Sequence, residues 1–256
     1  MCVDWLGINL TDLLPFIAIG FAAQMVDGAL GMAFGVITNT LLVGLMGLPP
    51  AQASQRVHVV ECFTTAVSGI SHLLHRNIDG KLFVRLVIPG VIGGVSGAYL
   101  LSNLDAELVR PFVMLYLALI GLFLLFRGIF YPPKIREARV VAPLGLIGGF
   151  LDAAGGGGWG PVVTSNLLIQ GTDPRKVIGT VNSAEFFLTL AISITFITQL
   201  GLADVAGATL GLLIGGIAAA PLGAWFAKRL PVKAMLILVG AVLTVTSAYN
   251  VWTAWG

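Results

Sequence analysis

Residues Gly145–Leu168 read GLIGGFLDAAGGGGWGPVVTSNLL, an apolar segment with four consecutive glycines at its centre. Glycine costs about 1 kcal/mol per residue in a helix interior, so this run should break a helix. The complete apolar segment, Val140–Gln170, is too long for one membrane span and too short for two spans and a turn. Freed backbone groups inside a membrane require protein or a water-filled cavity around them. We therefore predict a broken helix that forms a re-entrant hairpin.

A second segment follows the same plan. Residues Gly20–Leu42 read GFAAQMVDGALGMAFGVITNTLL, are interrupted at Asp27–Gly31 and lie inside the apolar segment Thr11–Gly47. The two segments align at an offset of 125 residues, which matches Asp27 with Asp152, Gly31 with Gly156, Phe34 with Trp159 and Gly35 with Gly160. Further along the chain the offset is 124 residues, which matches His58 with Asn182 and Glu61 with Glu185. This ordered run predicts two repeats, residues 1–131 and 132–256, fused at a Pro-rich connector.

The composition restricts the class of protein. The 256 residues are 57% hydrophobic and only 10% charged, whereas about 25% of an ordinary soluble domain is charged. A soluble globule cannot hide that many apolar side chains. Two cysteines exclude a disulfide scaffold, and a net charge of +2 without a basic run excludes a nucleic-acid partner. The chain is predicted to be a polytopic membrane protein.

Six further apolar segments are long enough to span a bilayer, which requires about 20 helical residues. They lack the alternation of membrane strands and are Ser54–Leu74, Leu82–Leu101, Leu108–Phe130, Val177–Leu200, Ala203–Ala227 and Val232–Trp252. The predicted fold is an all-α, polytopic, single membrane domain. Each repeat contributes a re-entrant hairpin, 11–47 or 140–170, followed by three transmembrane helices. Eight continuous spans are the alternative.

Basic residues predict the orientation of the spans, because cytoplasmic loops are rich in Lys and Arg. One set of loops holds 12 of the 14 basic residues, and the opposite set holds only Arg56 and Arg110. If the basic loops are cytoplasmic, the first hairpin opens outside and the second opens inside. The repeats then have inverted topology, and both termini lie outside. The first residues carry no Lys or Arg, so no cleaved signal peptide is expected.

Ionisable residues inside the spans are candidates for function, because a charge there is costly. They form two repeat-related pairs, Asp27 with Asp152 and Glu61 with Glu185. His58 lies one turn before Glu61, and Arg56 enters the same span. Two interpretations of the aspartates stay open, since a carboxylate at a helix N-terminus also serves as a cap. For the glutamates we favour a role in transferring protons over a purely structural polar pair.

Backbone N–H groups at a helix start can hold an anion without a basic side chain. Hydroxyl and amide side chains near the two breaks add further donors. The candidate anion-binding residues are Gly31, Gly35, Asn39, Gly156, Gly157, Gly158, Trp159, Gly160, Ser165, Asn166 and Asn182. The alternatives are close helix packing for the glycines and bonds to their own helix for the polar side chains. No metal site or cofactor is expected, because no ligand spacing supports one.

The segment Gly148–Phe196 resembles the TauE/SafE family of sulfite or toxic-anion exporters. The most specific parts are the strings GGGGWGP (Gly155–Pro161), GTVN (Gly179–Asn182) and AEFF (Ala184–Phe187). The resemblance spans essentially the whole chain, since that family is a duplicated four-segment unit. It implies transport of sulfite, sulfoacetate or another organosulfonate across a bacterial or archaeal cell membrane. The first repeat departs from the pattern, with DGALGMAFG in place of a glycine-rich string.

Together these features predict a proton-coupled secondary transporter, an exporter of a small sulfur-containing anion. The anion would bind at the two helix breaks, and Glu61, Glu185 and His58 would carry protons. The expected partners are the anion, protons and the lipid bilayer. A cation carrier or channel using the intramembrane carboxylates is the main alternative, followed by a membrane scaffold without transport. An intramembrane enzyme is not expected, and no GxxxxGK[ST] string indicates ATP-driven pumping.

Overall fold

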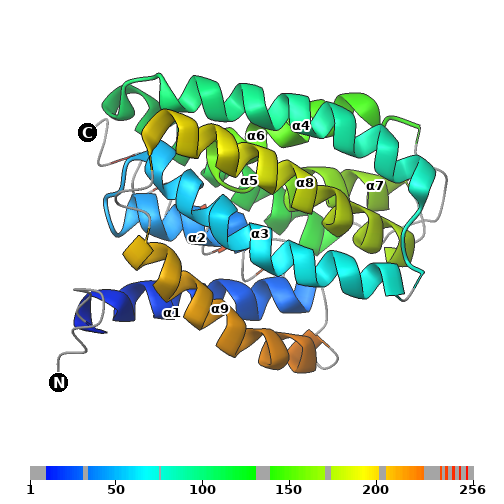
Figure 1. The fold of residues 1–256 in the computed structure, drawn as a ribbon, viewed down its shortest axis with the longest axis horizontal. Helices are drawn as coiled ribbons and strands as arrows, with labels where there is room; N and C mark the ends of the chain where they lie inside the picture. Colours follow the sequence, from blue (N-terminus) through cyan, green and yellow to red (C-terminus); the bar gives the residue numbers. More distant parts are fainter. Residues whose placement is uncertain are drawn as a thin grey trace.

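Helices form the fold in the computed structural model, which describes residues 10–30, 34–74, 76–130, 139–170, 174–201, 206–227 and isolated positions from 237 to 252 (Figure 1). Over these residues no strand occurs, which confirms the all-helical prediction. The helices are α1 (Leu10–Leu30), α2 (Phe34–Gly44), α3 (Pro50–Leu74), α4 (Gly80–Ser102), α5 (Ala106–Phe130), α6 (Ala142–Gly155), the π-helix η1 (Trp159–Thr164), α7 (Ser165–Gln170), α8 (Pro174–Leu200) and α9 (Ala206–Ala227).

Three of the described helices are long and apolar enough to cross a membrane: Pro50–Leu74, Gly80–Ser102 and Lys176–Leu200. They coincide with three of the predicted spans. Helices α3 and α8 begin a few residues before those spans, because each starts at a proline, which fits the first turn of a helix. The predicted spans 108–130 and 203–227 fall on α5 and α9, and the predicted span 232–252 lies largely outside the described residues.

Large apolar side chains cover the outer surface of these helices. Val67 and Leu74 on α3 are 71% and 77% exposed, and Ile88 on α4 and Phe112 on α5 are similarly uncovered. A water-soluble monomer rarely exposes continuous apolar surface of this kind. The surface is that of a helical membrane protein whose outer face contacts lipid.

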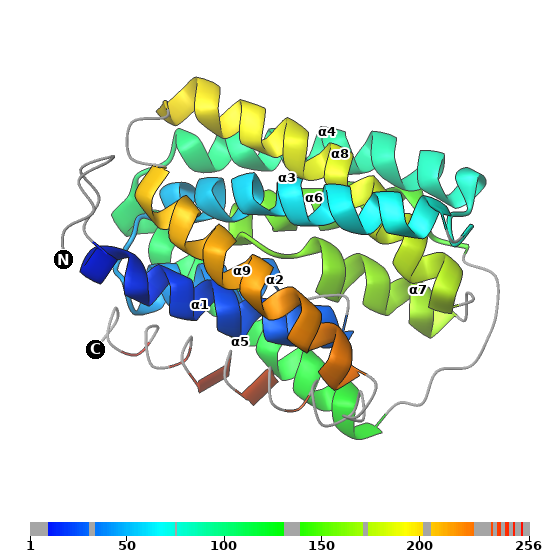
Figure 2. The ribbon, with the colours of Figure 1, turned by 60° about the horizontal axis from the view of Figure 1, so that its bottom comes forward.

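The two broken segments are hairpins that open toward opposite ends of the helix bundle (Figures 1 and 2). Helices α1 and α2 form the first, and α6, η1 and α7 form the second. The side chain of Gln170 joins the start and the end of the second hairpin, because it accepts hydrogen bonds from the N–H groups of Arg139 and Val140 at 2.8 and 3.0 Å. The second segment therefore begins and ends at the same end of the bundle.

Helix packing follows the correspondence between the repeats. Helix α1 packs against α9, and its counterpart α6 packs against α4, the counterpart of α9. Helices α3 and α8 correspond to one another and pack together. Both exchanged interfaces are close: a Cβ atom at Gly20 would meet the carbonyl of Leu212, and one at Gly149 would meet the carbonyl of Gly90. Two structurally related halves would produce this exchange, while their inverted orientation in the membrane stays a prediction.

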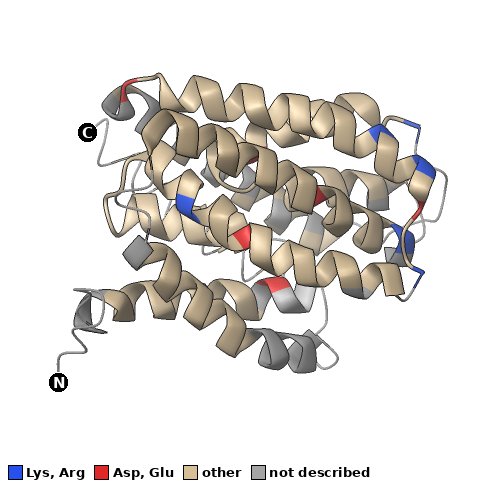
Figure 3. Ribbon diagram, viewed as in Figure 1, with Lys and Arg blue, Asp and Glu red and all other residues tan. Residues whose placement is uncertain are grey.

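Most of the Lys and Arg positions coloured on the ribbon lie at one end of the bundle, where α3 ends and α4 and α8 begin (Figure 3). The loops there are connected: Arg85 donates to the carbonyl of Arg139 at 3.3 Å, and Lys176 donates to that of Arg76 at 2.8 Å. The loops that the sequence groups as basic therefore include segments that meet at this end.

Candidate functional site

A small cavity lies between the two hairpin breaks. Carboxylates from both repeats line it together with glycines of the breaks; its lining residues are Asp27, Phe34, Gly35, Val36, Glu61, Asp152, Gly157, Gly160, Pro161 and Glu185. Its volume of about 20 Å³ is enough for roughly one water molecule. The cavity thus brings together the two repeat-related acidic pairs that the sequence singles out.

Asp152 shapes the second break through its carboxylate. Helix α6 ends at Gly155, and its C-cap residue, Gly156, has a φ of +66°, the left-handed conformation that glycine adopts without strain. The Asp152 Oδ1 atom then accepts hydrogen bonds from the N–H groups of Gly158 at 2.7 Å and Trp159 at 2.9 Å. Asp152 therefore caps the start of η1 from the last turn of α6.

Asp27 occupies the related place in the first break. It lies in the last turn of α1, and its Oδ1 atom accepts a hydrogen bond from the N–H of Phe34 at 3.3 Å, where α2 begins. The sequence predicts these N–H groups as donors to an anion. In this structure the N–H groups of Phe34, Gly158 and Trp159 donate to the aspartates of the chain itself, which satisfies unpaired donors at a helix start.

The two breaks are in direct contact. A Cβ atom at Gly35 would lie 2.6 Å from the carbonyl oxygen of Gly156, and one at Gly157 would meet the backbone nitrogen of Val36. Asn39 on α2 donates a hydrogen bond from its side chain to the carbonyl of Gly155. Its side-chain oxygen is buried and has no hydrogen-bond partner in the described part of the chain. Glycine is required here because the two backbones touch.

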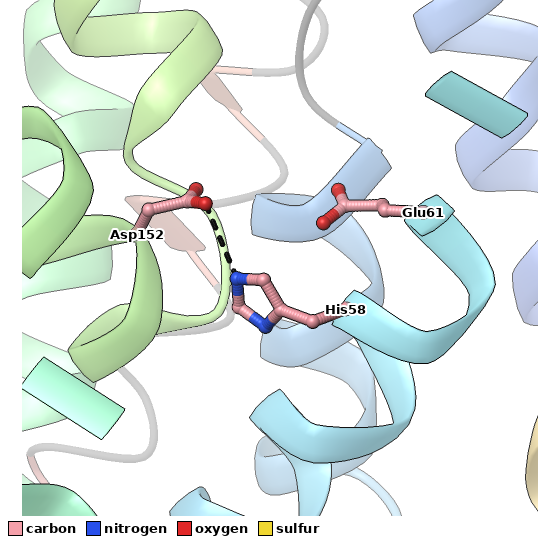
Figure 4. Close-up of side chains that lie close together, drawn as sticks. All are labelled: His58, Glu61 and Asp152. Carbon is pink, nitrogen blue, oxygen red and sulfur yellow. Dashed lines mark hydrogen bonds and ion pairs between the residues drawn. The ribbon is translucent and has the colours of Figure 1, made fainter. Parts of the chain in front are cut away.

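His58 connects α3 to the second break (Figure 4). Its Nε2 atom lies 3.2 Å from Asp152 Oδ2, and its Nδ1 atom lies 2.7 Å from the carbonyl oxygen of Ser54. Glu61, one turn further along α3, points toward the same place, and its Oε2 atom is buried without a hydrogen-bond partner in the described structure. Each of the three side chains offers one nitrogen or oxygen atom that could bind a cation, and these three atoms lie within 4.8 Å of one another. By distance, this space suits a small cation, whether a proton or a metal ion.

Several predicted residues lie away from the cavity lining. Asn166 of α7 donates to the carbonyl of Val162 in the preceding η1 at 2.7 Å, and Asn182 donates to that of Ile178 in its own helix, α8, at 2.9 Å. Trp159 is fully buried, and its indole N–H donates to the carbonyl of Val181 at 3.2 Å.

Three further predicted residues contact other groups. Cβ atoms at Gly156 and Gly158 would meet Asn39 and the Tyr116 hydroxyl, while Arg56 is buried and donates to the carbonyl of Gln52 at 2.9 Å. Gly31 and the side chain of Ser165 lie outside the described residues.

Two residues that no sequence pattern singles out also contribute to the site. Tyr116 of α5 lies against the glycines of the second break, and its hydroxyl is buried without a hydrogen-bond partner among the described residues. Ser54 of α3 donates to the carbonyl of Ala153 at 2.7 Å and so binds the last turn of α6. Tyr116 could have been found from the sequence as a polar aromatic residue inside an apolar span. No feature of the sequence distinguishes Ser54 from other serines in the spans.

Comparison with known proteins identifies the family. Residues 16–250 match the profile described as "Sulfite exporter TauE/SafE". The chain belongs to the TauE/SafE family. This TauE/SafE protein is 41% identical over 252 residues to "Probable membrane transporter protein YtnM" of Bacillus subtilis (strain 168), which covers 95% of this chain and 84% of that protein. It is 27% identical over 118 residues to "Probable membrane transporter protein YunE" of the same organism, covering 44% and 43%.

No solved structure is significantly similar to this TauE/SafE chain. The family match and the relative at 41% identity, together with the apolar helices, identify a multi-pass membrane transporter. The protein is not an enzyme.

Proposed function

We propose that this TauE/SafE protein is a proton-coupled secondary transporter that exports a small sulfur-containing anion, namely sulfite, sulfoacetate or another organosulfonate. The family description supports the class of substrate. The observation that carries the proposal is the cavity between the two hairpin breaks, which four carboxyl groups line. Broken helices that meet at the interface of two repeats are where secondary transporters bind their substrates.

The carboxyl groups that line the cavity support proton coupling. Two like unit charges 4 Å apart repel by about 4 kcal/mol at an effective dielectric constant of about 20. An anion therefore enters only if carboxylates in the cavity take up protons first. Glu61 and Glu185, which line the cavity from α3 and α8, carry these protons in our proposal, with His58 beside them. The anion then accepts hydrogen bonds from N–H groups of the second half-helices, around Gly35 and Gly160.

Transport requires the breaks to separate. A cavity of about 20 Å³ has no room for sulfite, which is larger than a water molecule. We propose that the hairpins part alternately toward the two sides, breaking contacts such as the hydrogen bond from Asn39 to the carbonyl of Gly155.

We further propose that the protein lies in a bacterial or archaeal cell membrane, with its basic end in the cytoplasm and both termini outside. The gathering of Lys and Arg at one end of the bundle supports this orientation. An anion that leaves the cell with a net negative charge is driven by the membrane potential. The gain is about 2.3 kcal/mol per unit charge at 100 mV.

The test is sulfite flux from proteoliposomes under an imposed pH gradient. We expect the gradient to change the flux through the wild-type protein, and Glu185→Gln to remove this response. Asp105→Asn is the matched control, because Asp105 is an exposed acid that does not line the cavity. Proton coupling through Glu185 is refuted if the Glu185→Gln protein retains the full response.

A cation carrier is the second candidate, favoured by the convergence of His58, Glu61 and Asp152 within 4.8 Å. Saturable binding of Na⁺ or a divalent metal ion, lost in Glu61→Gln and accompanied by cation flux, would support it. Sulfite flux without any dependence on metal ions would exclude it.

A further inference from the structure

The hydrogen bonds of His58 fix the proton on one ring nitrogen. Its Nδ1 atom lies 2.7 Å from the carbonyl oxygen of Ser54, which can only accept. The same atom lies 3.2 Å from the hydroxyl of Ser54, whose hydrogen is already donated to the carbonyl of Ala153. Both contacts require a donor, so Nδ1 of His58 carries a hydrogen.

The other ring nitrogen then faces a carboxylate. Nε2 lies 3.2 Å from Asp152 Oδ2, and both groups are almost completely buried. A lone pair on each atom would repel the other, so one proton must lie between them. The pair is either an imidazolium with a carboxylate or a neutral imidazole with a carboxylic acid. In both forms it holds one extra proton and has no net charge.

The repeat-related position cannot do the same. Asn182 stands where His58 would be, has no proton to exchange and bonds the carbonyl of Ile178 in its own helix. Asp27 stands where Asp152 would be, and its carboxylate accepts a hydrogen bond from the N–H of Phe34. The two halves are thus chemically unequal at the point where they meet.

We infer that the His58–Asp152 pair is the resident proton site of the transporter and that Glu61 exchanges protons with it. This inference rests on the proposed proton coupling and deepens it. The buried Glu61 Oε2 atom, which has no hydrogen-bond partner in the described structure, accepts a proton from the pair. The step leaves neutral His58, an Asp152 carboxylate and a Glu61 carboxylic acid, and a proton from water later restores the pair.

The surroundings of the pair come from several helices. Asp27 of α1 and Glu185 of α8 line the same cavity as Glu61 and Asp152. Tyr116 of α5 lies beside Gly158 of the second break, and the ring of Phe196 packs 6.2 Å from that of His58. Arg56 and Cys62, which flank His58 and Glu61 in the sequence of α3, are the other titratable residues nearby on that helix. Carboxyl groups of α1, α3 and α8, a tyrosine of α5 and a phenyl ring of α8 therefore surround the pair.

Asp152 also links this proton site to the second hairpin. Its Oδ2 atom faces His58 while its Oδ1 atom caps η1. A proton lost from the pair therefore changes the link between α3 and the second hairpin. In this role Asp152 is a positioning residue that couples protonation to movement of the break.

The test uses Asp152→Asn, which preserves the hydrogen bonds and removes the extra proton. The amide oxygen can accept the N–H groups of Gly158 and Trp159, and the amide nitrogen can donate to His58 Nε2. The chain has only three histidines, so ¹⁵N spectra of histidine-labelled protein resolve His58. We expect the wild-type Nε2 signal to be that of a nitrogen bridged by a proton. The Asp152→Asn protein should show a neutral ring and a sulfite flux that no longer responds to a pH gradient.

Asp105→Asn is the matched control for the spectra and should leave the His58 signals unchanged, because Asp105 is exposed and does not line the cavity. A wild-type Nε2 signal without a bridging proton, or one that changes when metal ions are removed with EDTA, would overturn the inference. A normal pH response in Asp152→Asn would overturn it as well. If wild-type sulfite flux has no pH response at all, the proposed function fails, and the ¹⁵N spectra still test the pair. Should Asp152→Asn not fold, His58→Asn, which copies the other repeat, is measured instead with the same expected loss of pH response.

Discussion

Substituting Gly35 with alanine tests the contact between the two hairpin breaks. The added Cβ atom would lie 2.6 Å from the carbonyl oxygen of Gly156, 2.8 Å from Glu61 Oε1 and 3.0 Å from the Cα atom of Gly157. Two of these atoms are backbone of the opposite hairpin and cannot rotate away. Relief of the overlap requires the breaks to move apart.

Overpacking of this kind typically costs about 1–3 kcal/mol. Alanine also stabilises a helix by about 1 kcal/mol relative to glycine, and this gain must be cancelled by a control. Gly216→Ala supplies it, because Gly216 is a buried helical glycine of α9 whose added Cβ atom would lie no closer than 3.9 Å to any neighbour. The difference in the free energy of unfolding between the two variants should therefore be roughly 1–3 kcal/mol.

Thermal unfolding of the purified variants in detergent, followed by tryptophan fluorescence, measures this difference. For a chain of this size 1 kcal/mol corresponds to roughly 2–4 °C. The Gly35→Ala protein should thus unfold roughly 2–12 °C below Gly216→Ala. If the two variants unfold at the same temperature, the breaks do not touch in the way described, and the reasoning is refuted.

Three other predictions follow from the same structure. Trp159→Phe leaves the Val181 carbonyl without its indole donor and should lower the free energy of unfolding by about 1–3 kcal/mol. Thermal unfolding measures this loss, and an unchanged midpoint would contradict a stabilising role of the indole hydrogen bond. Single cysteines at positions 49 and 105 should both be labelled from outside the cell, whereas one at Lys81 should be protected; protection of position 49 with labelling of position 105 would contradict the hairpin topology. Sulfite affinity, measured by calorimetry, should rise as the pH is lowered, because protonation removes repulsion from the carboxylates; a higher affinity at high pH would contradict proton uptake before binding.

Much of the fold could be predicted from the sequence because the decisive features are local. The four glycines after Asp152 end α6 where a helix of this composition cannot continue, and apolar length alone locates α3, α4 and α8. The predicted span begins at Ser54, whereas α3 begins at Pro50. The residues between them are too polar to be recognised as part of a membrane span, although they belong to the helix.

The site was predictable in its acidic residues and not in its hydrogen bonds. The alignment of the two repeats identifies four acidic residues, and all of them line one cavity: Asp27, Asp152, Glu61 and Glu185. Nothing in the sequence decides whether the N–H groups of a half-helix donate to an anion or to a nearby aspartate. The contact of His58 with Asp152 joins residues 94 positions apart, so it depends on how α3 packs against the second hairpin.

The central claim, a sulfur anion bound together with protons, is tested most directly by thermal stabilisation of the purified protein. The panel contains sulfite, sulfoacetate, thiosulfate, sulfate, Na⁺ and divalent metal ions, each at two pH values. A ligand at 100 times its dissociation constant stabilises the folded state by about 2.7 kcal/mol. We predict stabilisation by a sulfur anion that is larger at the lower pH. Stabilisation by cations alone would show instead that the carboxylates are cation ligands, and would contradict the account.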